Sequence, residues 1–145
     1  MKDKTYKTSG EACSTDDSYQ IIGGWFSVFK IDGNDVTDSD NELIDIESYR
    51  QAYIDFSKNY RDANFDHTGA VRGTLVDNIL IDTPEFAKML VHQITGMPIE
   101  EITVKRLGHF GSFQLHDAGD FEDAKKNKLM FSIEGTCERV EVDDE

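Results

Sequence analysis

The segment LMFSIEGTCERV, residues 129–140, places a hydroxyl and a carboxyl on one face of a predicted strand. Side chains alternate along a strand, so Met130, Ser132 and Glu134 share the face opposite Leu129, Phe131 and Ile133, and Gly135 follows. This face is either exposed to solvent or holds a serine nucleophile on a rigid scaffold. A nucleophile also needs a base to take its proton and donors for the oxyanion, so this pattern leaves both interpretations open.

A base would come from one of the four histidines, because imidazole titrates near neutral pH. His67 ends the strand-like run ANFDH and precedes a Thr-Gly turn, a position from which a side chain can line a cleft. His92 falls in a predicted helix, off its apolar face, where we expect a surface position. His109 and His116 have no obvious partner in the sequence. A histidine taken alone most often has a structural or surface role, so the residues by themselves single out no base.

Other chemistries lack their motifs. There is no HxxxH or HExxH pair, and Asp66 and His67 point to opposite faces of a strand, so we expect no metal and no cofactor. The acidic turn 32–42 lacks the central glycine of an EF-hand loop. The hydrolase elbow GxSxG and the phosphate loop GxxxxGK[ST] are also missing. Cys13 and Cys137 form no CxxC motif, which favours a reduced, cytosolic protein.

Length and charge limit the class of protein. The 145 residues predict one folded domain over 20–145, preceded by a flexible polar arm over 1–19. The chain has 29 acidic and 15 basic side chains, a net charge of −14, which argues against binding nucleic acid or an anionic membrane surface. No apolar run is long enough to span a membrane, and the first residues lack the apolar region of a secretory signal.

Hydrophobic spacing predicts the elements that would position these side chains. We expect helices over 42–60, 82–96 and 119–128, and strands over 19–31, 63–67, 71–81, 102–117 and 129–142. Strands joined by short turns favour antiparallel pairing. The predicted fold class is therefore α+β, a mostly antiparallel bent sheet or small β-barrel flanked by helices.

Two of these helices carry recognisable end signals. Asp45 is a suitable N-cap for the first, and Thr83 or Asp82 for the second, where Pro84 takes the first helical position and Gly96 ends the helix. The second helix is expected to bury one apolar face against the domain, made of Phe86, Met89, Leu90 and Ile94.

The order of several motifs over residues 20–140 resembles the XkdF-like serine proteases of tailed phages. These belong with the prohead (capsid maturation) proteases and are related in fold to the herpesvirus assemblins. The matching pieces are a Gly-Trp strand (IIGGWFSVF), an acidic turn before an amphipathic helix, and a histidine followed by a glycine and then GTLVD. A G-x-F strand, a D-x-F segment with a short charged helix, and the closing FSIEG follow in the same order.

The resemblance implies a concrete site. The histidine of the family's DH-x-G motif falls on His67, the general base, and the serine of FSIxG falls on Ser132, the nucleophile. Gly135 would leave room for a substrate backbone. The implied partners are the scaffold and capsid proteins of a phage procapsid, and the implied location is the procapsid interior or the host cytoplasm. A homo-oligomer is left open.

The third catalytic residue is not identified. The family's E-[IV]-S-L-V strand, whose glutamate orients the histidine, has no counterpart before Glu145, and Glu138 and Asp77 are the candidates in this chain. The orienter is supplied by such a residue, or the chain is truncated or self-processed at Glu145, or catalysis is impaired. The alternatives to the enzyme are a non-catalytic head or assembly protein on the same fold, and an acidic adaptor domain without chemistry.

Overall fold

The computed structural model describes residues 12–36, 42–60, 62–64, 71–127 and 139–141. The strands are β1 (Ala12–Asp16), β2 (Ile21–Ile31), β3 (Asn34–Asp35), β4 (Glu42–Ile44), β5 (Asp62–Asn64), β6 (Val71–Ile81), β7 (Arg106–Leu115) and β8 (Arg139–Glu141). The helices are α1 (Ile46–Asp55), continued by the π-helical turn η1 (Phe56–Tyr60), then α2 (Pro84–Thr95), the 3-10 turn η2 (Ile99–Glu101) and α3 (Ala118–Asn127).

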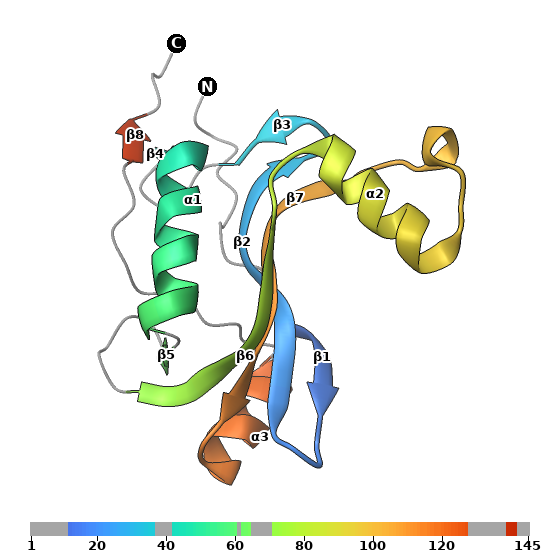
Figure 1. The fold of residues 1–145 in the computed structure, drawn as a ribbon. Coiled ribbons are helices and arrows are strands. Elements are labelled where there is room, and N and C mark those ends of the chain that lie inside the picture. The colour runs from blue at the N-terminus through green and yellow to red at the C-terminus, as the bar shows by residue number, and fades with distance from the viewer. Residues whose placement is uncertain (1–11, 37–41, 61, 65–70, 128–138, 142–145) are drawn as a thin grey trace.

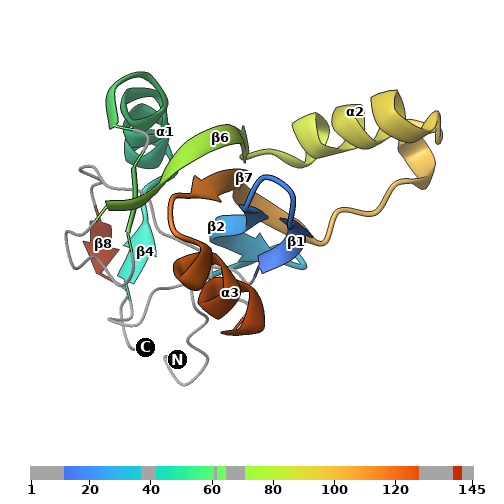
Figure 2. The same ribbon diagram turned by 90° about the horizontal axis from the view of Figure 1, so that it is seen from below.

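An open antiparallel sheet organises the fold. Its strands follow the order β1-β2-β7-β6-β5, β3 pairs with β2, and β4 and β8 form a separate antiparallel pair. Figures 1 and 2 show α1 along one side of this sheet and α3 at its lower end. The α+β class and the antiparallel pairing are confirmed. The described strands leave the sheet open at β1 and β5, so they do not form the small barrel that was the alternative.

The larger apolar core lies between the sheet and the helical elements η1 and α3. Phe26 of β2 and Phe113 of β7 stack with ring centroids 4.7 Å apart, and Phe56 of η1 and Phe121 of α3 pack in the same cluster. Burying a side chain of this size is worth about 1.5–3 kcal/mol. The cluster therefore fixes η1 and α3 on the sheet. Its buried members are Ile22, Phe26, Phe56, Leu75, Phe113, Leu115, Phe121 and Ala124.

The helix ends follow the capping signals in the sequence. The Asp45 carboxylate accepts from the Ser48 backbone N–H at 3.2 Å, and Thr83 Oγ1 accepts from the Phe86 N–H at 3.1 Å. Gly96 ends α2 with φ of 76°, a left-handed conformation that glycine adopts without strain. The helix predicted over 42–60 begins later, because its first residues form β4 instead. In the described part of the chain, every helix is too short or too polar to cross a membrane.

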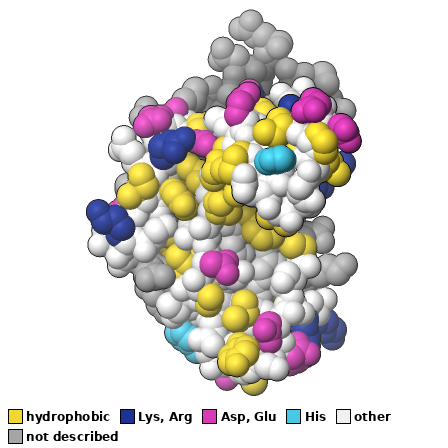
Figure 3. Space-filling model, turned by 45° about the vertical axis from the view of Figure 1, so that its right-hand side comes forward, with side chains coloured by type: hydrophobic (Ala, Val, Ile, Leu, Met, Phe, Trp, Pro, Cys, Tyr) yellow, Lys and Arg dark blue, Asp and Glu magenta, His cyan; other side chains and the backbone are white. Residues whose placement is uncertain are grey.

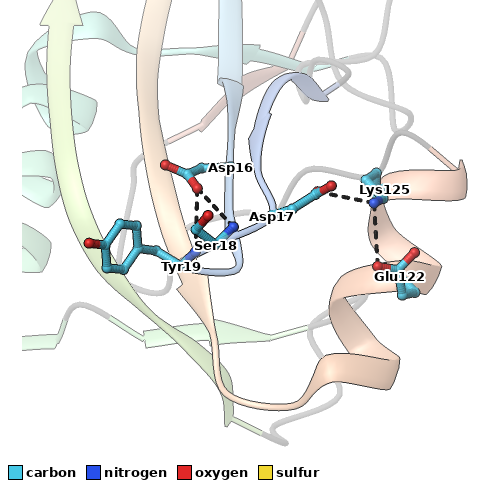
Figure 4. Close-up of polar contacts among 6 residues, drawn as sticks. All are labelled: Asp16, Asp17, Ser18, Tyr19, Glu122 and Lys125. Carbon is cyan, nitrogen blue, oxygen red and sulfur yellow. Dashed lines mark hydrogen bonds and ion pairs between the residues drawn. The ribbon is translucent and has the colours of Figure 1, made fainter.

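The flexible arm predicted over 1–19 is wrong for residues 12–19. Residues 12–16 form β1, which pairs with β2, and the Asp16 carboxylate stabilises the following turn by accepting from the Ser18 N–H at 3.0 Å. Figure 4 shows Asp17 reaching Lys125 of α3, with Asp17 Oδ1 and Lys125 Nζ 3.1 Å apart. Polar composition suggested an arm, but strand pairing and this ion pair attach the hairpin to the domain.

The buried face predicted for α2 is also wrong. Ile94 is 80% exposed and Met89 is 38% exposed, and Ala87 is the one α2 residue that is buried. Figures 1 and 2 show the reason: α2 lies in the connection between β6 and β7 and projects away from the sheet. Figure 3 turns the side of the molecule that carries α2 toward the viewer, and hydrophobic side chains gather in the upper half of this face. From here on, the arm means α2 and η2 with the residues between them, and not the N-terminal segment 1–19.

Candidate functional site

The two residues predicted to carry catalysis lie outside the described residues. His67 falls within 65–70 and Ser132 within 128–138, so their roles stay predictions. Glu138, one candidate for the orienting acid, falls in the second of these ranges as well.

The structure does describe the elements on either side of both segments. Asn64 of β5 and Val71 of β6 are register partners in neighbouring strands, and these strands flank the segment that contains His67. The segment that contains Ser132 runs from the end of α3 at Asn127 to the start of β8 at Arg139. Phe121 and Ala124 fix α3 in the larger core. The described elements that precede and follow these two ranges are therefore paired or packed.

Among the described residues, the most developed polar cluster surrounds His109 in the middle of β7. Its Nδ1 lies 2.9 Å from the Tyr49 hydroxyl of α1, and its Nε2 lies 2.7 Å from Asn78 Oδ1 of β6. Ser27 Oγ of β2 lies 3.2 Å from the same Tyr49 hydroxyl. We call these four residues the His109 cluster. With the Asn78 oxygen able only to accept, Nε2 carries the imidazole proton and Nδ1 accepts from Tyr49.

Strand alternation and close strand approach bring the His109 cluster together. His109 shares its face of β7 with Phe113 and Leu115, both buried, so its ring points into the core. Gly108 and Gly111 stand on either side of it. A Cβ at Gly108 would overlap the Ser27 carbonyl oxygen, and one at Gly111 would overlap the Asp77 carbonyl oxygen. These glycines let β2 and β6 approach β7 closely enough for the cluster to form.

A β-bulge decides which polar residue of β6 belongs to the cluster. The register with β7 shifts between Leu75 and Asp77, so the alternation changes phase there. Leu75 and Leu80 are buried, Asn78 lies with them near His109, and Asp77 is exposed. Asp77, the other candidate for the orienting acid, therefore does not contact His109, the one buried histidine among the described residues.

Burial keeps His109 neutral. Its side chain is 0% exposed and is surrounded by the rings of Phe26, Tyr49 and Tyr53, whose centroids lie 4.8, 5.6 and 5.0 Å from the imidazole. Loss of hydration on burial lowers the pKa of His109 to about 3. At neutral pH the ring neither titrates nor meets solvent, and both its nitrogens are occupied. The cluster is a structural link between α1, β2, β6 and β7.

A second hydroxyl–imidazole pair is exposed. Thr74 Oγ1 of β6 lies 2.9 Å from His116 Nε2, just beyond the end of β7. His116 also lines a hollow of about 430 Å³ beside the β1–β2 turn. In the described part of the chain, no carboxylate is recorded against the second nitrogen of this ring. The pair therefore has two of the three groups of a triad, and its hydroxyl is the more hindered one of a threonine.

Sequence reasoning missed the partners of both histidines. His109 could have been found, because the alternation His109, Gly111, Phe113, Leu115 puts it on an otherwise apolar face, where an imidazole needs hydrogen-bond partners. The contact from Tyr49 had no local signal. His92 lies in the last turn of α2, as expected, with Nδ1 2.9 Å from the Met97 carbonyl oxygen. Within the described ranges, no group of three or more His, Cys, Asp or Glu side chains could hold a metal ion.

Comparison of the chain with protein-family models, with curated proteins and with solved structures found no match in any of the three. The resemblance to the phage proteases therefore depends on the order of its motifs alone.

Proposed function

We propose that this chain is a serine endopeptidase of the phage capsid-maturation type, with Ser132 as nucleophile and His67 as general base. The observation that carries the proposal is the order of motifs over 20–140, from the Gly-Trp strand to FSIEG. The antiparallel α+β sheet is consistent with it at the level of fold class. Its substrates are scaffold and capsid-protein extensions inside the procapsid, and the chain itself.

The proposed reaction is acyl transfer. Ser132 Oγ attacks the scissile carbonyl carbon while His67 takes the hydroxyl proton, and His67 then gives that proton to the leaving amine. Water, deprotonated by the same imidazole, hydrolyses the acyl-enzyme and restores Ser132. His109 has no part in this reaction, because its imidazole is buried, both its nitrogens are hydrogen-bonded, and its pKa of about 3 makes it a weak base. Asp77 or Glu138 would orient His67.

A fluorophosphonate probe tests this proposal directly, because it labels activated serines without requiring knowledge of the substrate. We expect the wild-type protein to be labelled at Ser132, as located by peptide mass spectrometry. Ser132→Ala should abolish labelling, and His67→Gln should reduce it about 10²-fold or more, since it removes the base.

Matched variants control for the loss of any serine or histidine. Ser14→Ala changes an exposed serine of β1, and His92→Gln changes a histidine of the arm, so both should keep wild-type labelling. An unlabelled wild-type protein, or equal labelling of wild type and Ser132→Ala, would remove the proposal.

One observation favours the alternative function, a non-catalytic head or assembly protein. The arm presents Ile94, Met97 and Ile99 at 80%, 43% and 45% exposure, and hydrophobic side chains exposed together are found at interaction sites. This alternative predicts no probe labelling, together with sedimentation as an oligomer that Ile94→Glu dissociates. A labelled monomer would exclude it.

A further inference from the structure

A hollow lies at the base of the arm, where α2 begins beside the β2–β3 turn and the segment that leads into β7. Its volume is about 330 Å³. Buried Ile102 and Leu107 line it, together with Val104 and Pro84. Figure 1 shows these elements converging at the upper end of the sheet. We call it the arm-base hollow.

Three lysines from three different elements line the same hollow. They are Lys30 of β2, Lys88 of α2 and Lys105, which directly precedes β7. Lys30 is paired with Asp35 at 3.0 Å, whereas Lys88 and Lys105 have no ion-pair partner recorded among the described residues. No carboxylate is among the lining residues that the structure describes.

This concentration of positive charge opposes the charge of the whole chain. The protein has a net charge of −14, yet three of its 15 basic side chains line one small hollow. The N-terminal end of α2 adds to the positive potential there, because Pro84 lines the hollow and a helix carries partial positive charge at its first turn. The local field therefore favours carboxylates.

We propose that the arm-base hollow binds an acidic peptide segment of a partner protein, with an apolar side chain on Ile102 and Leu107 and flanking carboxylates on Lys88 and Lys105. A peptide fits better than a small anion, since a single carboxylate contact with an exposed lysine is weak and would leave the apolar lining unused. A short peptide also fits better than nucleic acid, because its apolar side chain can use the lining of Ile102 and Leu107, whereas a long polyanion would extend beyond the hollow over a protein with a net charge of −14. The proposal does not depend on protease activity.

Fluorescence polarisation with fluorescein-labelled peptides tests it. The probe is the peptide Glu-Asp-Leu-Glu-Asp, and the controls are Gln-Asn-Leu-Gln-Asn, which lacks the charges, and Glu-Asp-Ser-Glu-Asp, which lacks the apolar side chain. We expect binding of the probe that weakens as salt increases, and weaker binding of both controls. Amide chemical-shift changes on adding the probe should include Gly33, Ile102 and Val104.

Matched double variants separate a specific site from general electrostatics. Lys88→Gln with Lys105→Gln should weaken binding of the probe about tenfold, from the loss of two charge contacts at the protein surface. Lys58→Gln with Lys126→Gln removes the same charge from exposed positions of η1 and α3, and should change the affinity less than about twofold. Lys58, Lys105 and Lys126 are exposed and Lys88 is half-buried, so folding should be retained and is checked by circular dichroism.

Three results would overturn the proposal: no binding of the probe to the wild-type protein, equal weakening by both double variants, or equal binding of the serine control peptide. Tighter binding of a labelled oligothymidylate than of the probe would instead assign the hollow to nucleic acid. Full competition by inorganic phosphate at low millimolar concentration would assign it to a small anion.

Discussion

The Tyr49 hydroxyl lies 2.9 Å from Nδ1 of His109 and joins α1 to the middle of β7. Both residues are buried, at 4% and 0% exposure, so the imidazole nitrogen and the hydroxyl have no water to replace this hydrogen bond. A buried polar pair of this kind contributes little net stability when intact, yet losing one partner is costly. Because of this asymmetry, the pair gives the sharpest mutational test of the fold.

Tyr49→Phe should lower the free energy of unfolding by about 1–3 kcal/mol, because it leaves His109 Nδ1 buried without a donor. Urea denaturation followed by circular dichroism measures the change. Tyr53→Phe is the matched control, because Tyr53 packs its ring on the same imidazole and no hydrogen bond of its hydroxyl is recorded among the described residues. Equal losses in the two variants would contradict the geometry of the His109 cluster.

The pKa of His109 predicts how stability depends on pH. In the unfolded chain this imidazole takes up a proton below about pH 6.5, whereas in the folded protein its pKa is about 3. Between these values the unfolded state binds more protons. The free energy of unfolding should therefore fall with decreasing pH, with up to about 1.4 kcal/mol per pH unit due to this group.

His109→Gln isolates that contribution. Urea titrations between pH 4 and pH 7 should show a shallower pH dependence for the variant than for the wild type, whatever its overall stability. The carboxylates and the other histidines affect both proteins alike. If the free energy of unfolding changed equally with pH in the variant and the wild type, His109 would not be buried in its neutral form.

Gly111→Ala should destabilise the domain, because its Cβ would overlap backbone and side-chain atoms of Asp77 and Asn78 on the adjacent strand. We expect a loss of about 1–3 kcal/mol or more in the free energy of unfolding, as for other overpacked sites. Gly119→Ala is the control, since its Cβ would meet only the carboxylate end of Asp117. Thermal denaturation of the two variants should separate them clearly.

Ile94→Glu should leave stability within about 0.5 kcal/mol of wild type, because this side chain is 80% exposed. Phe113→Ala, at a position with 0% exposure in the larger core, should cost about 3–5 kcal/mol. The difference in urea midpoint between the two variants measures which apolar residues the fold buries. A large loss from Ile94→Glu would mean that the arm packs against the domain.

Local chemistry in the sequence was enough to predict most elements. Interactions within a few residues determine the N-caps Asp45 and Thr83 and the left-handed Gly96 at the end of α2. The structure has all three at the predicted positions. The alternation of β2, β6 and β7 likewise follows from neighbouring residues. The antiparallel α+β class follows from these elements and their short connections.

Tertiary structure alone decided which faces are covered. The apolar stripe of α2 was readable, but its exposure depends on where the β6–β7 connection directs the helix, and no spacing rule encodes that direction. The partners of His109 come from residues 31 and 60 positions away in the chain, and a bulge in β6 selects Asn78 over Asp77. A sequence specifies local conformation through adjacent residues, whereas the His109 cluster requires four separately formed elements, α1, β2, β6 and β7, to pack before its hydrogen bonds exist.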